Sequence, residues 1–162
     1  MQTRKISVFL FCTYLILLAW MIVFKFDLSI LYGRYGFASI NLIPLAGTAV
    51  YGGVLDFPEI LFNIVSFIPF GIYMEILFRK ASWIVNLFVI MLVSLVFEVA
   101  QYTLLLGVAD ITDLLANGFG GAIGINIMYV LTSIWHEKAY ARMNIFCLVL
   151  TIVVILTTYS FV

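Results

Sequence analysis

Long apolar runs alternate with short polar segments along this chain of 162 residues. A run of about 20 apolar residues is long enough to cross a bilayer as a helix. Five runs meet that length, and they cover residues 6–26, 57–78, 82–106, 114–135 and 143–162. The first is too long for the apolar part of a signal peptide and no cleavage site follows it, so we expect an uncleaved anchor. The pattern predicts an all-α, polytopic transmembrane helix bundle that forms one domain over residues 1–162.

The composition agrees with a membrane protein. Hydrophobic residues make up 65% of the chain and charged residues 10%, whereas soluble domains are about half apolar and a quarter charged. The formal net charge is zero, so we expect no nucleic-acid partner. Cys12 and Cys147 lie inside apolar runs, where we expect small packing residues rather than a disulfide.

Basic residues predict the orientation of the bundle. With the N-terminus inside, six of the eight Lys and Arg residues face the cytoplasm: Arg4, Lys5, Arg79, Lys80, Lys138 and Arg142. Only Lys25 and Arg34 then face outside. The positive-inside rule therefore predicts an N-in, C-out topology. At the cytoplasmic interface we also expect Glu75 and Arg79 to pair, because residues four apart share a helix face.

Polar residues inside the apolar runs gather at the predicted outer end. Glu59 and Asn63 are four apart near the start of the second run, and Glu98 and Gln101 are three apart near the end of the third. Each pair therefore shares a helix face. Glu98 lies about 12 Å below the outer end at 1.5 Å per residue, a depth at which a carboxyl group is costly.

The stretch Asp110-Ile-Thr-Asp113-Leu-Leu-Ala-Asn117 allows two interpretations. Asp110 and Asp113 fit the N-cap and third positions of a capping box. Acids at the membrane end of an apolar helix are also candidates for a functional site. Beyond them, Ala116, Gly120 and Gly124 recur at spacing four and predict close approach of another helix.

Together these residues predict one outward-facing polar pocket in the outer leaflet. Its members come from three segments, the last of which begins at the turn with Asp110 and Asp113, and are Glu59, Asn63, Glu98, Gln101, Asp110, Asp113 and Asn117. Carboxylates also ligate divalent cations, so Glu98, Asp110 and Asp113 are candidate ligands for such an ion. The spacing does not decide whether a divalent cation or another cofactor is bound, or whether any of these residues is catalytic.

Four motifs occur in order over about residues 40–125. They read Asn41-Leu-Ile-Pro44, Asn63-Ile-Val-Ser-Phe-Ile-Pro69-Phe-Gly71, Ser94-x3-Glu98-x2-Gln101 and Asp110-x2-Asp113-Leu-Leu-x-Asn117-x2-Gly120. In this combination the chain resembles the VanZ-like family of bacterial membrane proteins. The resemblance adds Asn41 to the candidate pocket. Family members often carry an arginine just ahead of the first aspartate, where this chain has Gly107-Val-Ala-Asp110. A pairing role for that arginine would here be absent or would fall to Arg34.

The resemblance implies a multi-pass protein of the bacterial plasma membrane with a role in low-level resistance to teicoplanin, a lipoglycopeptide antibiotic. We expect the pocket to bind or modify a membrane lipid, a lipid-linked envelope precursor or the lipoglycopeptide itself. Two alternatives stay open. One is a metal-dependent membrane enzyme acting on an envelope lipid, and the other is a helix-packing scaffold without chemistry of its own.

Overall fold

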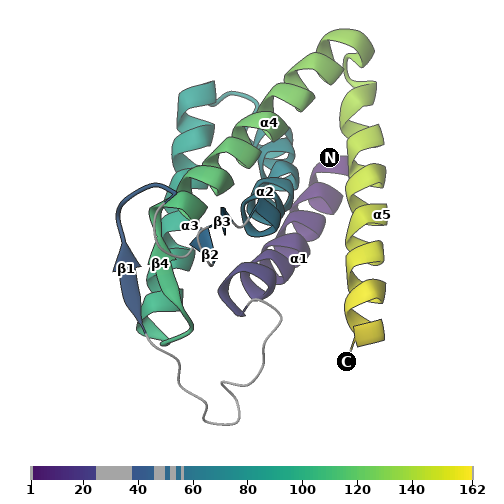
Figure 1. Cartoon of the computed structure of the whole chain (residues 1–162). Helices are drawn as coiled ribbons and strands as arrows, with labels where there is room; N and C mark the ends of the chain where they lie inside the picture. Colours follow the sequence, from purple (N-terminus) through teal and green to yellow (C-terminus); the bar gives the residue numbers. More distant parts are fainter. Residues whose placement is uncertain (1, 25–37, 46–49, 52–53, 56, 162) are drawn as a thin grey trace.

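The computed structural model describes residues 2–24, 38–45, 50–51, 54–55 and 57–161, with side chains described within 4–24, 38–45 and 57–152. Five helices make up most of it (Figure 1): α1 Gln2–Phe24, α2 Phe57–Leu77, α3 Trp83–Thr103, α4 Ile111–Trp135 and α5 Lys138–Phe161. Four short strands lie between them: β1 Ser39–Asn41, β2 Val50–Tyr51, β3 Val54–Leu55 and β4 Val108–Asp110. The predicted all-α bundle is confirmed.

The helices are also long and apolar enough for a membrane protein. Among the described residues, four helical segments meet that condition, namely Arg4–Phe24, Phe57–Leu77, Trp83–Thr103 and Ile111–Trp135. The fifth predicted span corresponds to α5, which begins at Lys138, five residues before the predicted start. The orientation of the bundle in the membrane stays a prediction.

Local hydrogen bonds explain where α3 and α4 differ from the predicted runs. The helix α4 begins three residues early because Asp110 adopts extended backbone angles and caps it. The helix α3 begins after its N-cap Ser82, whose side chain accepts a hydrogen bond from the amide of Val85. It ends at Thr103 because Leu104 caps it and Leu105 has a φ of 56°.

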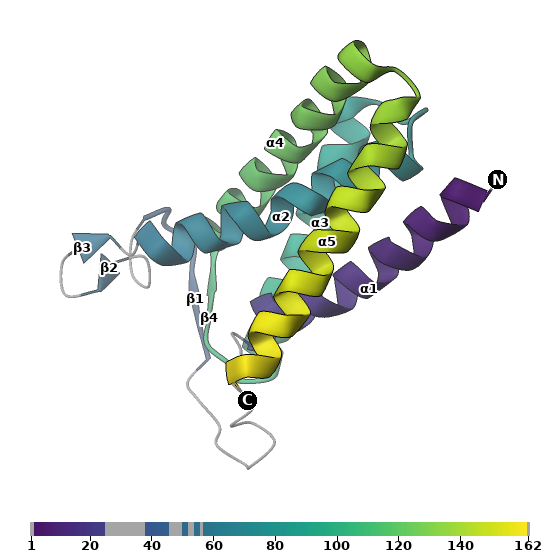
Figure 2. The same ribbon diagram turned by 90° about the vertical axis from the view of Figure 1, so that its right-hand side faces the viewer.

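Glycines allow α2 and α4 to pack backbone against backbone, and the two helices lie side by side in both views (Figures 1 and 2). A Cβ added at Gly120 or Gly124 would overlap the carbonyl oxygen of Ile64 or Ile68. A Cβ at Gly71 of α2 would overlap the carbonyl oxygen of Gly121 in the same way. The close approach expected from the small-residue spacing is therefore confirmed.

Around this contact the core is rich in aromatic side chains. Phe67, Phe70 and Tyr73 of α2 are almost completely buried. The ring of Phe11, from α1, lies 5.5 Å from that of Phe70 and 5.4 Å from that of Tyr73. This packing attaches α1 to the α2–α4 pair.

The short strands were not predicted. Strand β1 pairs in parallel with β4, so that Asn41 lies opposite Asp110. This pairing brings part of the first loop against the segment between α3 and α4 (Figure 2). Strands β2 and β3 form a separate antiparallel pair. Pairings of two or three residues are too short to give a periodic signal in a sequence.

Candidate functional site

Four of the eight candidate residues line a single cavity of about 230 Å³. They come from α2, α3 and α4 and are Glu59, Asn63, Gln101 and Asp113. Met21 and Ile22 of α1 and Phe62 of α2 complete the lining. The cavity therefore combines polar groups from three helices with an apolar wall, at the end of the bundle where α1 ends and α2 and α4 begin.

Gln101 is the most deeply buried polar residue of this cavity. Its side chain is 2% exposed, and its Nε2 donates a hydrogen bond of 2.9 Å to the carbonyl oxygen of Ile22. Its Oε1 is buried and has no hydrogen-bond partner among the described residues. A buried acceptor without a partner is uncommon in proteins, because it loses its hydrogen bonds to water and gains none in return.

The two carboxylates of the cavity lie at helix starts. Glu59 is in the first turn of α2 and Asp113 in the first turn of α4, where the helix dipole favours negative charge. Ionised carboxylates only accept hydrogen bonds, and one N–H of the Gln101 NH₂ group already donates to Ile22. The cavity is thus rich in acceptors, which suits a ligand group that carries hydroxyl or ammonium donors.

Asp110 organises a second group of candidate residues. Its Oδ1 accepts a hydrogen bond of 2.8 Å from the amide of Thr112, and its Oδ2 accepts one of 3.1 Å from Nδ2 of Asn41. The amide of Asp110 donates to Oε2 of Glu98 at 2.9 Å. Asp110 is therefore the N-cap, as one interpretation of the sequence held. In a capping box the N3 acid would accept from this amide, and here Glu98 of α3 does so.

This network joins the first loop to the helix starts. Oδ1 of Asn41 accepts from the amide of Ile43, and Oγ1 of Thr112 accepts from the amide of Leu45 at 3.0 Å. Sequence reasoning missed Thr112, although its position in the first turn of α4 was a usable signal. Glu98 and Asp110 also border a second cavity of about 230 Å³, which is otherwise mainly apolar and includes the half-exposed Tyr102.

Asn117, the last candidate, lies one turn below Asp113 and outside both cavity linings. It is fully buried, and its Nδ2 donates to Oγ of Ser94 at 2.9 Å, which joins α4 to α3. Its Oδ1 has no hydrogen-bond partner in the described part of the chain. The eight candidates thus divide into a cavity, a capping network and a helix-packing contact.

The expected metal ligands are not gathered into one group. Within the described residues, no three His, Cys, Asp or Glu side chains are placed to hold a metal ion together. Glu98 and Asp110 accept hydrogen bonds from backbone amides, while Asp113 lines the cavity with Glu59. Arg34 lies outside the described residues, so its relation to Asp110 stays a prediction.

The prediction that Glu75 and Arg79 pair with each other is wrong, because each side chain has a different partner. Oε2 of Glu75 accepts from Nδ2 of the buried Asn86 at 3.2 Å, whereas Arg79 pairs with Glu137 of the α4–α5 turn. Helix α2 ends at Leu77, so Arg79 lies beyond the helical face on which the prediction depended.

Comparisons with known proteins agree with the arrangement of motifs. The family model described as VanZ/LLP1 matches residues 11–133. Protein VanZ from Enterococcus faecium is 30% identical over 148 residues, which cover 91% of this chain and 88% of that protein. No solved structure matches. The matched region contains α2, α3 and most of α4, with both cavities and the capping network, and the chain belongs to the VanZ/LLP1 family.

Proposed function

We propose that this protein is a multi-pass protein of the bacterial plasma membrane that contributes to low-level teicoplanin resistance. In this proposal the cavity lined by Glu59, Asn63, Gln101 and Asp113 binds the polar part of a lipid-linked envelope component or of the lipoglycopeptide. The acyl chain of the ligand stays in the bilayer. Family membership supports the resistance phenotype, and the chemistry of the cavity supports the kind of ligand.

The unsatisfied acceptor of Gln101 carries the proposal. An apolar ligand would leave Oε1 of Gln101 without a partner, whereas a sugar hydroxyl or an ammonium group would satisfy it. Lipid-linked envelope precursors and lipoglycopeptides carry many such donors on their sugar and peptide parts. The apolar wall formed by Met21, Ile22 and Phe62 suits the neighbouring hydrocarbon of the same ligand.

The proposal is tested by removing charge without changing shape. Glu59→Gln and Asp113→Asn, separately and together, should fold with a stability loss below about 1 kcal/mol, because both replacements keep an acceptor. Binding of a donor-rich ligand should weaken because hydrogen bonds to charged acceptors are the stronger ones. In a host that depends on this gene for protection, the double variant should lower the minimal inhibitory concentration of teicoplanin to that of the empty vector.

A matched control lies on the same helix as Asp113. Asn126 is exposed and its side chain donates to the carbonyl oxygen of Ala122 on its own helix, so Asn126→Ala should keep wild-type protection. Full protection by a well-expressed double variant would contradict the proposal and return the cavity to a packing role. Stabilisation of the wild type by a divalent cation in detergent, lost in the double variant, would instead favour the metal-dependent enzyme.

A further inference from the structure

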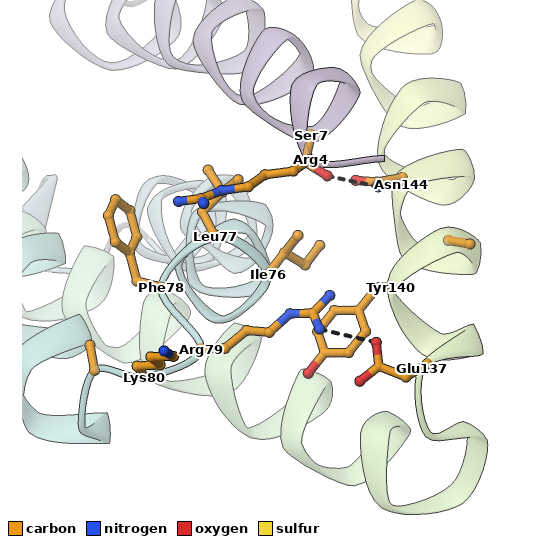
Figure 3. Close-up of a pocket in the computed structure, with 12 residues that line it drawn as sticks. Arg4, Ser7, Ile76, Leu77, Phe78, Arg79, Lys80, Glu137, Tyr140 and Asn144 are labelled. Atoms are coloured by element: carbon orange, nitrogen blue, oxygen red, sulfur yellow. Dashed lines mark hydrogen bonds and ion pairs between the residues drawn. The ribbon is translucent and has the colours of Figure 1, made fainter. Parts of the chain in front are cut away.

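A larger cavity, of about 560 Å³, lies at the opposite end of the bundle (Figure 3). The N-terminal part of α1, the end of α2, the α2–α3 turn and the start of α5 enclose it. The basic residues at this end predict that it faces the cytoplasm. None of the eight candidate residues described above lines it.

The cavity has an excess of positive charge. Arg4 of α1 and Arg79 and Lys80 of the α2–α3 turn line it, and Glu137 is the one acidic residue in the lining that the structure describes. Nη1 of Arg79 lies 3.1 Å from Oε2 of Glu137, and its guanidinium lies 3.3 Å from the centre of the Tyr140 ring. Figure 3 shows Arg79 lying against Tyr140 and joined to Glu137, whereas the Arg4 side chain of α1 extends toward Leu77 and Phe78.

Asn144 supplies a second, independent observation. It lines the same cavity and is 6% exposed. Its Nδ2 donates to Oγ of Ser7 at 2.8 Å, whereas its buried Oδ1 has no hydrogen-bond partner among the described residues. A ligand in this cavity would therefore encounter cations at the rim and an acceptor in the wall that requires a donor.

The rest of the lining is apolar. Ile76, Leu77 and Phe78 form part of it, and Phe78 is 49% exposed. Trp83 and Trp135 begin α3 and end α4 near this end of the bundle, as interfacial aromatic residues do. Basic pockets between helices at this depth suit phospholipid head groups.

We propose that this cavity binds the head group of an anionic phospholipid that carries a hydroxyl group, such as phosphatidylglycerol. Arg4 and Lys80 contact the phosphate, and the head-group hydroxyl donates to Oδ1 of Asn144. Glu137 and Tyr140 fix the position of the Arg79 guanidinium in the wall of the cavity. The acyl chains leave along the apolar side formed by Leu77 and Phe78. Free inorganic phosphate offers the same anion but gains nothing from that apolar side, so the lipid is the expected source.

The test measures binding to the full-length protein in a non-ionic detergent, by thermal shift and by native mass spectrometry. Phosphatidylglycerol should raise the melting temperature and remain bound, while phosphatidylcholine and inorganic phosphate should not. Removing one surface cation should weaken binding by about fivefold. Arg4→Gln combined with Lys80→Gln should therefore weaken it by about 25-fold.

Lys5→Gln is the matched control, since Lys5 is exposed beside Arg4 but does not line the cavity. It should bind within about twofold of wild type, because it lacks the phosphate contact that is worth about fivefold. Ala141→Glu, at an exposed position of the lining, should abolish binding by placing a second carboxylate in the cavity. Equal losses from Lys5→Gln and Arg4→Gln would overturn the proposal in favour of general surface attraction. If inorganic phosphate raised the melting temperature of the wild type but not of the double variant, the ligand would be the free anion and the proposed lipid would be wrong.

Discussion

At the end of the bundle where α2 and α4 begin, the side chain of Asp110 accepts two hydrogen bonds at once. One of its oxygens caps α4 and the other accepts from Asn41 of β1. Because both bonds are to donors, replacing the carboxylate with a carboxamide should break one of them. In Asp110→Asn the new NH₂ group would face the NH₂ group of Asn41, and the melting temperature in detergent should fall by the equivalent of about 1 kcal/mol.

Exchanging the two side chains should repair that loss. In the double variant Asn41→Asp with Asp110→Asn, the carboxylate lies on β1 and accepts from the new carboxamide, while the cap on Thr112 is kept. The melting temperature should return close to that of wild type. Asp110→Ala, which removes the cap as well, should cost about 0.5–2 kcal/mol and should not be rescued by Asn41→Asp. Additive losses in the exchange variant would show that Asp110 needs its charge for another purpose.

Residue-level predictions from the sequence succeeded for the N-cap and failed for the Glu75–Arg79 pair, although both depend on nearby residues. The N-cap role of Asp110 depends on residues two positions away, so its spacing was sufficient. Glu98 instead accepts from an amide twelve residues further along, across the turn between α3 and α4. No periodic pattern contains that contact. The sequence also could not predict that Oε1 of Gln101 lacks a hydrogen-bond partner among the described residues. The orientation of that side chain is set by its bond to Ile22, which is 79 positions away.

At the scale of elements, the contact between α2 and α4 has no room for a side chain at its glycines. Gly120→Ala or Gly124→Ala would place a methyl group on a carbonyl oxygen of α2, and the two backbones would have to separate. Each change should destabilise the protein by about 1–3 kcal/mol, as overpacking does. Gly107→Ala is the control, because a Cβ there would contact nothing within 4 Å. Thermal melting in detergent measures all three, and similar melting temperatures would contradict the close contact.

The elements themselves differed in how well the sequence predicted them. The apolar runs predicted every helix, because burial in lipid requires about 20 apolar residues in a row. Their ends were less accurate, since Asp110 and Leu105 set them through capping and backbone conformation. The β1–β4 pair was missed because pairing joins segments 69 residues apart, as the register of Asn41 with Asp110 shows. It places Ile40 and Leu42 of the first loop in the lining of the second cavity, beside Glu98 and Asp110.

At the scale of the whole molecule, the two ends of the bundle have opposite chemistry. Carboxylates and carboxamides line the cavity at one end, with Glu59 and Asp113 among them. Arg4, Arg79 and Lys80 line the cavity at the other. The positive-inside rule uses only the sequence, yet basic residues from two separate segments, α1 and the α2–α3 turn, line the same cavity. The proposed resistance function of the acidic cavity therefore depends on this orientation.

Labelling of single cysteines tests that orientation directly. In a background without Cys12 and Cys147, Ile43→Cys places a thiol at the acidic end and Glu137→Cys places one at the basic end. Both positions are well exposed, at 67% for Ile43 and 83% for the Glu137 side chain, and neither change removes a basic residue. With the N-terminus inside, a membrane-impermeant thiol reagent should label position 43 in intact cells and position 137 only after permeabilisation. The reverse pattern would place the acceptor-rich cavity in the cytoplasmic leaflet, where teicoplanin does not reach, and would contradict the proposed function. Lipid binding at the basic end is measured in detergent and does not depend on this result.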